Sequence, residues 1–161
     1  MADVYIRPLG YDDARTSYKW RNDPDIWKLT GSRPDREIKL EDEQTWIKKV
    51  IADETCRRFA IIADEVYVGN IYLTGIHDST AEYHVFIGDK NYWGKGIASA
   101  ASEQIIGFGR SELHLKSIFL KVHKENNAAI HVYKKMGFVE QNTEGKFIVM
   151  VLDLSSRKAT A

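Results

Sequence analysis

The sequence of 161 residues contains one cysteine, three prolines and no apolar run long enough to cross a membrane. The single cysteine, Cys56, cannot form an intrachain disulfide, which favours a reducing compartment. The first ten residues, MADVYIRPLG, lack the basic and then apolar pattern of a secretory signal peptide. We therefore expect a cytoplasmic protein that has no membrane partner.

A net charge is also missing, because Lys plus Arg and Asp plus Glu each total 23. This balance argues against a general binder of nucleic acids or of membrane surfaces. The histidines are scattered without the spacing of metal ligands, so we expect no metal site. The hydrophobic content of 43% is ordinary for a globular chain, and the length suits a single domain over residues 1–161.

Hydrophobic periodicity and turn residues predict seven strands and four helices in the order β-α-α-β-β-β-α-β-α-β-β. Residues 23–39 hold Pro24, Gly31 and Pro34, and this composition predicts a long irregular connection. The expected strands are Val4–Pro8, Arg58–Ala63, Val66–Thr74, Ala81–Ile87, Ser117–Val122, Phe138–Gln141 and Phe147–Leu154. The expected helices run through Ala14–Trp20, over Leu40–Ala52, from Ile97 onward and over Asn126–Met136.

A short glycine loop lies between the expected strand Ala81–Ile87 and the helix that begins near Ile97. Gly94 and Gly96 let the backbone approach a ligand closely, and the first helical N–H groups that follow attract anions. The P-loop pattern fails here, because Trp93 and Gly96 stand where it needs Gly and Ser or Thr. The dinucleotide pattern fails as well, because Ser99 occupies the place of its third glycine. The loop therefore predicts a phosphate site of another kind.

Two blocks of the sequence resemble the GNAT N-acetyltransferases. Residues 91–96, Asn-Tyr-Trp-Gly-Lys-Gly, are similar to the pyrophosphate loop Q/R-x-x-G-x-G/A of that family, with Asn91 in place of Gln or Arg. Residues 126–138 match its segment N-x-x-A-I-x-x-Y-x-K-x-G-F at every named position. The resemblance implies an acyl-CoA N-acyltransferase fold of α+β class, an α/β/α sandwich around a mixed, mostly antiparallel sheet of about seven strands.

The resemblance also implies an acetyl-CoA-dependent enzyme that transfers acetyl directly to a primary amine. Within the family, the layout is similar to the branch of ribosomal-protein N-terminal acetylases and spermidine acetyltransferases. Residues 20–22, Trp-Arg-Asn, are similar to transferases that act on nucleotide-linked amino sugars. The acceptor is then a small molecule or a peptide amine, and we expect a monomer or a homodimer. The alternative is a non-catalytic acyl-CoA-binding module that regulates a partner.

The donor site follows from the same resemblance. Asn126 and Tyr133 lie seven residues apart and share a helix face, where the resemblance makes Asn126 a pantetheine ligand and Tyr133 the acid that protonates the thiolate. The backbone near Val85, Phe86 and Ile87 is expected to pair with the pantetheine amides, because the family splits its sheet there. The pyrophosphate is expected at the loop, on the N–H groups of Trp93, Gly94, Lys95, Gly96, Ile97 and Ala98 and beside Asn91.

The general base and the acceptor pocket are less constrained. Glu82 and His84 alternate onto one strand face, and we take Glu82 as the base and His84 as a second candidate. Water can also remove the amine proton without a dedicated residue. Candidates for the acceptor pocket come from the first two helices and the connection between them, although each can equally be structural: Trp20, Asn22, Trp27 and Arg33.

The charges around this connection support two kinds of acceptor. Seven acidic side chains favour a cationic acceptor such as a polyamine or a peptide amino terminus, whereas Arg21, Arg33 and Arg36 suit a nucleotide-linked sugar. The sequence leaves both open. The acidic residues are Asp23, Asp25, Asp35, Glu37, Glu41, Asp42 and Glu43.

Overall fold

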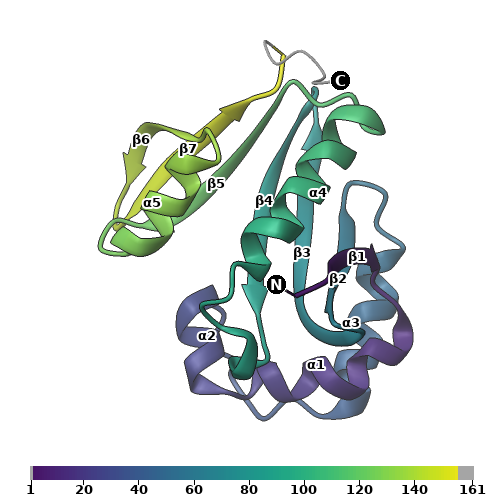
Figure 1. The fold of residues 1–161 in the computed structure, drawn as a ribbon. Helices are drawn as coiled ribbons and strands as arrows, with labels where there is room; N and C mark the ends of the chain where they lie inside the picture. The colour runs from purple at the N-terminus through teal and green to yellow at the C-terminus, as the bar shows by residue number, and fades with distance from the viewer. Residues whose placement is uncertain (1, 156–161) are drawn as a thin grey trace.

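The computed structural model describes residues 2–155, apart from the side chains of Leu29 and Thr30, and it contains one seven-stranded sheet (Figure 1). The strand order is β1-β2-β3-β4-β5-β7-β6. All neighbouring pairs are antiparallel except β4 and β5, which confirms the mixed, mostly antiparallel sheet. The strands are β1 (Val4–Pro8), β2 (Arg57–Ala63), β3 (Val66–His77), β4 (Thr80–Ile87), β5 (Ser117–His123), β6 (Val139–Glu144) and β7 (Phe147–Asp153).

Five α-helices accompany the sheet in residues 2–155, one more than expected. The prediction of an irregular connection over residues 23–39 was wrong, because α2 occupies much of it. The Asp23 side chain accepts a hydrogen bond from Asp25 N, and Pro24 takes the first helical turn, where its missing N–H costs nothing. The helices are α1 (Ala14–Arg21), α2 (Pro24–Thr30), α3 (Leu40–Ile51), α4 (Ile97–Ser111) and α5 (Asn127–Lys135), with 3₁₀ turns η1 (Tyr11–Asp13) and η2 (Lys90–Tyr92).

The strand ends of the last hairpin also differ from the prediction. The strand expected over Phe138–Gln141 runs over Val139–Glu144, so the turn lies later than expected. Gly145 then takes a positive φ of 59°, which suits a glycine in a tight turn.

Side-chain alternation along the strands divides the core between the two faces of the sheet. Ile71, Leu73 and Tyr83 belong to the large buried cluster that includes residues of α4 and is extended by residues of α5. On the opposite face, Ala60 and Tyr72 pack in a second cluster with residues of α3. The helices therefore cover both faces, which gives the expected α/β/α layering.

The sheet splits between β4 and β5. Parallel pairing between these strands covers only three residue pairs and ends where Glu82 lies beside Phe119. Beyond that point β4 continues to Ile87 and β5 continues to His123 without pairing to each other. In Figure 1 the two strands lie together at the top of the view and diverge below. This wedge-shaped gap positions the site described next.

Gly88 holds the end of β4 against α1, and its replacement should destabilise the fold. A Cβ added there would lie 2.0 Å from the ring of Trp20, which is only 7% exposed and cannot swing away. We expect Gly88→Ala to lower the free energy of unfolding by about 1–3 kcal/mol, the usual cost of overpacking, as measured by urea denaturation. Gly107→Ala is the matched control, because a Cβ there meets nothing within 4 Å and alanine favours the α4 helix. Equal stabilities of the two variants would contradict this packing.

Candidate active site

A cavity of about 850 Å³ lies at the split between β4 and β5. Tyr133 and Ala129 of α5 line it from one face of the sheet, and Trp46 of α3 lines it from the other. Tyr83 and His84 follow each other along β4 and both line the cavity, although alternation directs their side chains to opposite faces. The cavity therefore connects the two faces through the gap in the sheet.

Tyr133 stands on the α5 side of this cavity. Its ring meets the ring of Tyr83 edge to face with centroids 6.1 Å apart, and the ring of Phe138 lies 5.9 Å away. Burial among these rings raises the pKa of the Tyr133 phenol above its ordinary value of 10.0. The group is a neutral phenol at physiological pH and can donate a proton.

Asn126 begins α5 and also lines the cavity. Its Oδ1 accepts a hydrogen bond of 3.2 Å from Ala129 N, which caps the helix. The cap and the helical spacing explain why Asn126 and Tyr133 reach the same cavity from one helix. The side-chain nitrogen of Asn126, Nδ2, has no hydrogen-bond partner within residues 2–155.

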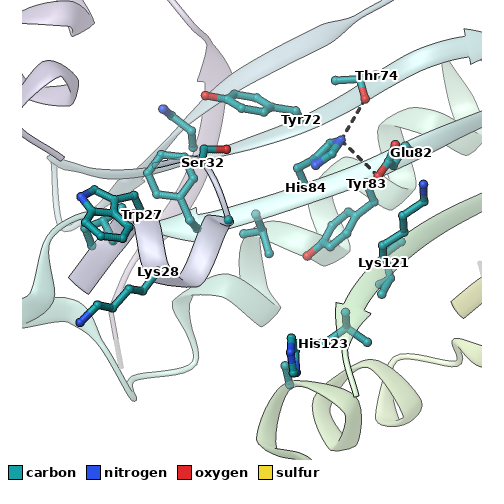
Figure 2. A pocket seen from close by; sticks show the side chains of 18 of the residues that line it. Trp27, Lys28, Ser32, Tyr72, Thr74, Glu82, Tyr83, His84, Lys121 and His123 are labelled. Atoms are coloured by element: carbon teal, nitrogen blue, oxygen red, sulfur yellow. Dashed lines mark hydrogen bonds and ion pairs between the residues drawn. The ribbon is translucent and has the colours of Figure 1, made fainter. Parts of the chain in front are cut away.

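Glu82 and His84 of β4 line the opposite side together with Thr74 of β3 (Figure 2). The His84 Nε2 atom lies 3.0 Å from Thr74 Oγ1 and 3.8 Å from Glu82 Oε2. Burial lowers the pKa of His84 below 6.5; Glu82 opposes this shift, whereas the cations of Arg58 and Lys121 add to it. A neutral imidazole can accept a hydrogen bond from an ammonium group.

The glycine loop precedes α4 and lies outside the cavity lining. Gly94 and Gly96 adopt positive φ angles of 71° and 74°, and both have open space where a side chain would stand. Trp93 N already donates to Lys90 O, which removes Trp93 from the expected donors. The next recorded backbone donor is Ala100 N, so the N–H groups of residues 94–99 have no partner within the described chain.

The loop is tied to β4 by two side-chain contacts. The Trp93 Nε1 atom donates to Ile87 O at 2.8 Å, so this carbonyl already has a partner. The Tyr83 hydroxyl bonds Ser102 Oγ, which donates in turn to Ala98 O at 2.6 Å. Of the three residues predicted for the strand edge, Val85 and Phe86 line the cavity and Ile87 does not. These contacts fix the loop relative to the gap in the sheet.

The acceptor residues predicted from the first helices fall into two groups. Trp20 and Trp27 line the cavity, and Trp20 also packs on Tyr67 with ring centroids 4.8 Å apart. Asn22 lies outside the lining because its side chain joins α1 to Ile38, accepting from Ile38 N at 2.8 Å and donating to Ile38 O at 2.7 Å. Arg33 also lies outside, with its guanidinium 5.3 Å from the Trp27 ring centroid.

The acidic residues that favoured a cationic acceptor lie away from the cavity or are neutralised. Of the seven, only Glu43 lines it, and Arg21 Nη1 lies 2.7 Å from Glu43 Oε1. Lys90 neutralises two more of them, and Arg36 pairs with another. The Lys90 Nζ atom is 2.8 Å from Asp23 and 2.6 Å from Asp25, and Arg36 is 3.0 Å from Asp42. The acidic residues of this connection therefore place no unpaired carboxylate in the cavity lining.

The lining residues that were not predicted from the sequence include Arg58 of β2, Trp46 of α3 and Tyr72 of β3. Arg58 stands directly before the apolar run Phe59–Ala63, and a cation at that place was the available signal. Only the pairing of β2, β3 and β4 shows that Arg58, Tyr72 and His84 form one row across the sheet.

Comparison with known proteins assigns the family. The family model described as an acetyltransferase (GNAT) domain matches residues 3–139. The chain belongs to this family. It is accordingly an N-acetyltransferase with acetyl-CoA as acyl donor, and the fold is the acyl-CoA N-acyltransferase fold.

Individual relatives agree with this assignment. The spermidine N(1)-acetyltransferase of Escherichia coli K12 is 32% identical over 138 residues, which cover 84% of this chain and 72% of the relative. The acetyltransferase PseH of Campylobacter jejuni is 25% identical, with 94% of this chain and 92% of PseH covered. The Vibrio cholerae spermidine N-acetyltransferase, crystallised with CoA and spermine, superposes with a TM-score of 0.84 at 24% identity, covering 94% of this chain and 96% of the other.

Membrane-spanning helices and clusters of metal-binding side chains are both absent from the described residues. None of the helices within residues 2–155 is long and apolar enough to cross a bilayer. The same residues contain no group of three or more His, Cys, Asp or Glu side chains arranged to hold a metal ion.

The environment of His84 makes a direct prediction for its titration. In an NMR titration of the His84 ring we expect a pKa below 6.5, so that the ring is neutral at pH 7. Lys121→Gln should raise this pKa because it removes a neighbouring cation, and Glu82→Gln should lower it because it removes the neighbouring anion. Glu103→Gln on the exposed part of α4 serves as the control and should leave it unchanged. A wild-type pKa above 6.5 would contradict the described surroundings.

Proposed function

We propose that the cavity between β4 and β5 is the active site, in which an acetyl group passes directly from acetyl-CoA to the primary amine of a small molecule. The observation that carries this proposal is the gap in the sheet. Through this gap Tyr133 and the pair Glu82 and His84 line one cavity from opposite faces of the sheet, and Tyr133 would be the proton donor. The residues 1–161 would act as a single N-acetyltransferase domain, and we expect it in the cytoplasm as a monomer or a homodimer.

The donor side of the proposed site suits a long anionic thioester. The unpartnered N–H groups of residues 94–98 at the start of α4 would bind its pyrophosphate, with Lys95 and Asn91 beside them. The unpaired edge of β4 near Val85 would pair with the pantetheine amides, as a peptide adds to a sheet. Asn126 would donate its side-chain amide to the same arm. Acetyl-CoA supplies the activated acetyl group.

An ammonium nitrogen loses two protons when it becomes an amide, and the departing sulfur takes up one. Glu82 would accept the proton of the acceptor ammonium, and the neutral His84 ring would hold the amine beside it. The amine nitrogen bonds to the acetyl carbon as the carbon–sulfur bond breaks, and the Tyr133 hydroxyl would then protonate the sulfur. The second proton lost by the nitrogen would restore the Tyr133 phenol. Cys56 lies outside the cavity lining, which supports direct transfer without an acyl-enzyme.

The relatives and the motifs also support a proposal for the branch within the family. The 32% identity to a spermidine N(1)-acetyltransferase supports the branch that contains spermidine acetyltransferases and ribosomal-protein N-terminal acetylases. A panel of polyamines, peptide amino termini, aminoglycosides and amino sugars, assayed for free thiol, tests the proposal. A non-catalytic CoA-binding module would release no thiol with any of them.

Tyr133→Phe should separate catalysis from donor binding. We expect the variant to lower kcat by about 10²–10⁴-fold, the usual contribution of a general acid, while the Kd for CoA changes little because the ring remains. Thiol release and calorimetric CoA binding provide the two measurements. Tyr11→Phe, at an exposed tyrosine outside the cavity lining, should keep full activity. Wild-type activity in Tyr133→Phe would eliminate the assigned acid.

Gly96→Ala should weaken donor binding at the loop. Alanine is strained at its φ of 74°, and its methyl group would shift the unpartnered N–H groups that follow. We expect the Kd for CoA to rise by about tenfold. This corresponds to a loss of roughly 1.4 kcal/mol of binding free energy, which is within the usual cost of one strained residue. Gly145→Ala is the matched control, because Gly145 has a φ of 59° and equally open surroundings but lies in the β6–β7 turn. Equal CoA affinity in both variants would remove the loop from the donor site.

A further inference from the structure

We propose that the acceptor is an amine that also carries a carboxylate or phosphate group, and that Arg58 binds this anionic group. The inference rests on the proposed function, because it concerns the acceptor end of the same cavity. It names a substrate class and a specificity-determining residue.

Arg58 lies in one row with the residues proposed to handle the amine. Arg58 pairs with Tyr72 across β2 and β3, and Tyr72 pairs with His84 across β3 and β4. All three line the cavity. Because neighbouring strands are about 4.8 Å apart, the backbones of Arg58 and His84 are separated by roughly 10 Å. Their long side chains can therefore hold the two ends of one small molecule.

The guanidinium of Arg58 is held by aromatic rings and not by a carboxylate. Its central carbon lies 4.4 Å from the ring centroid of Tyr72 and 5.1 Å from that of Trp46. Its buried Nε atom has no hydrogen-bond partner, and within residues 2–155 no ion pair reaches the group. The edge donors of a stacked guanidinium point away from the ring faces, in the geometry that suits the two oxygens of a carboxylate or phosphate.

The remaining charges of the cavity agree with an anionic group. Its lining has two carboxylates, and Arg21 neutralises that of Glu43. Lys121 also lines the cavity, but it is paired at 3.3 Å with Glu144, which lies outside the lining. Among the lining charges without an ion pair to a carboxylate outside the cavity, Arg58 and Lys28 outnumber the carboxylate of Glu82, which leaves an excess of positive charge. A polyamine would bring several more cations beside Arg58, at a cost from like-charge repulsion.

Matched amine pairs test this inference through free-thiol release. One pair is 4-(aminomethyl)benzoate and benzylamine, which differ by a carboxylate; the other is glucosamine 6-phosphate and glucosamine, which differ by a phosphate. Spermidine is the cationic comparison. We expect the anionic member of at least one pair to show a kcat/KM about tenfold or more above its neutral partner and above spermidine. The pair that responds identifies the anionic group.

The Arg58 variants assign the preference to this side chain. Arg58→Gln should raise the KM for the anionic amine by about tenfold. The KM values for the neutral amine and for acetyl-CoA should stay within about twofold of the wild type. Arg58→Lys keeps the positive charge and should restore part of the lost affinity for the anionic amine. Arg57→Gln is the matched control, because Arg57 precedes Arg58 on the strand, lies outside the lining and donates to Glu54 O and Cys56 O. Its acceptor KM should equal that of the wild type.

Three results would overturn the inference. One is equal turnover of the anionic amines and of spermidine or the neutral amines by the wild type. The release of free thiol would still support the proposed function in that case. Another is an Arg58→Gln enzyme that keeps the preference, or one whose KM rises for acetyl-CoA instead. The third is a binding result, which can be measured without turnover. If no anionic amine raises the Tm of the wild-type CoA complex more than that of the Arg58→Gln complex, the inference fails. A Tm increase in the wild type alone supports it, whereas absence of thiol release from every amine counts against the proposed function.

Discussion

The end of hydrogen bonding between β4 and β5 is the constraint on which the rest of this site depends. Three residue pairs hold the two strands together, and after Glu82 and Phe119 the strands continue without pairing to each other. Buried backbone groups need partners, so an unpaired strand edge at a cavity is a site where a ligand can complete the sheet. The same gap is the passage by which the α5 face and the α3 face share one cavity. A fully paired sheet would have separated Tyr133 from Glu82 and His84.

The charge of the cavity is set by ion pairs that form elsewhere in the chain. A net charge of zero and an acidic stretch around α2 and α3 both describe the sequence as a whole. Folding places Lys90 between Asp23 and Asp25 and pairs Arg21 with Glu43, so these charges cancel within the protein. What faces the cavity is the remainder, chiefly Arg58 over its two aromatic rings. The electrostatics of a site therefore follow from the charges that have no ion-pair partner after folding. The composition of a sequence segment does not show which charges these are.

Local signals explain which elements could be predicted. The turn residues Asp64 and Glu65 both take positive φ, 48° and 68°, as the tight hairpin between β2 and β3 requires. The helix α5 begins where Asn126 caps it, and Asn126 and Tyr133 could be placed together from spacing alone. The helix α2 was missed because a proline such as Pro24 is common both in loops and in the first turn of a helix. The hydrogen bond that the Asp23 side chain accepts at the helix start favours the helix. Trp93 was misplaced among the free donors because the 3₁₀ turn η2 takes its N–H.

The sequence by itself determined the family and the order of the strands, and it predicted the donor end of the proposed site. Each of these is encoded by residues close together in the chain: the glycines before α4, the segment from Asn126 to Phe138, and the alternation of each strand. Only the tertiary structure decided the acceptor end. Its wall combines residues of α3, β2, β3 and β4 whose separation in sequence carries no information about contact, and strand register alone brings Arg58, Tyr72 and His84 into one row.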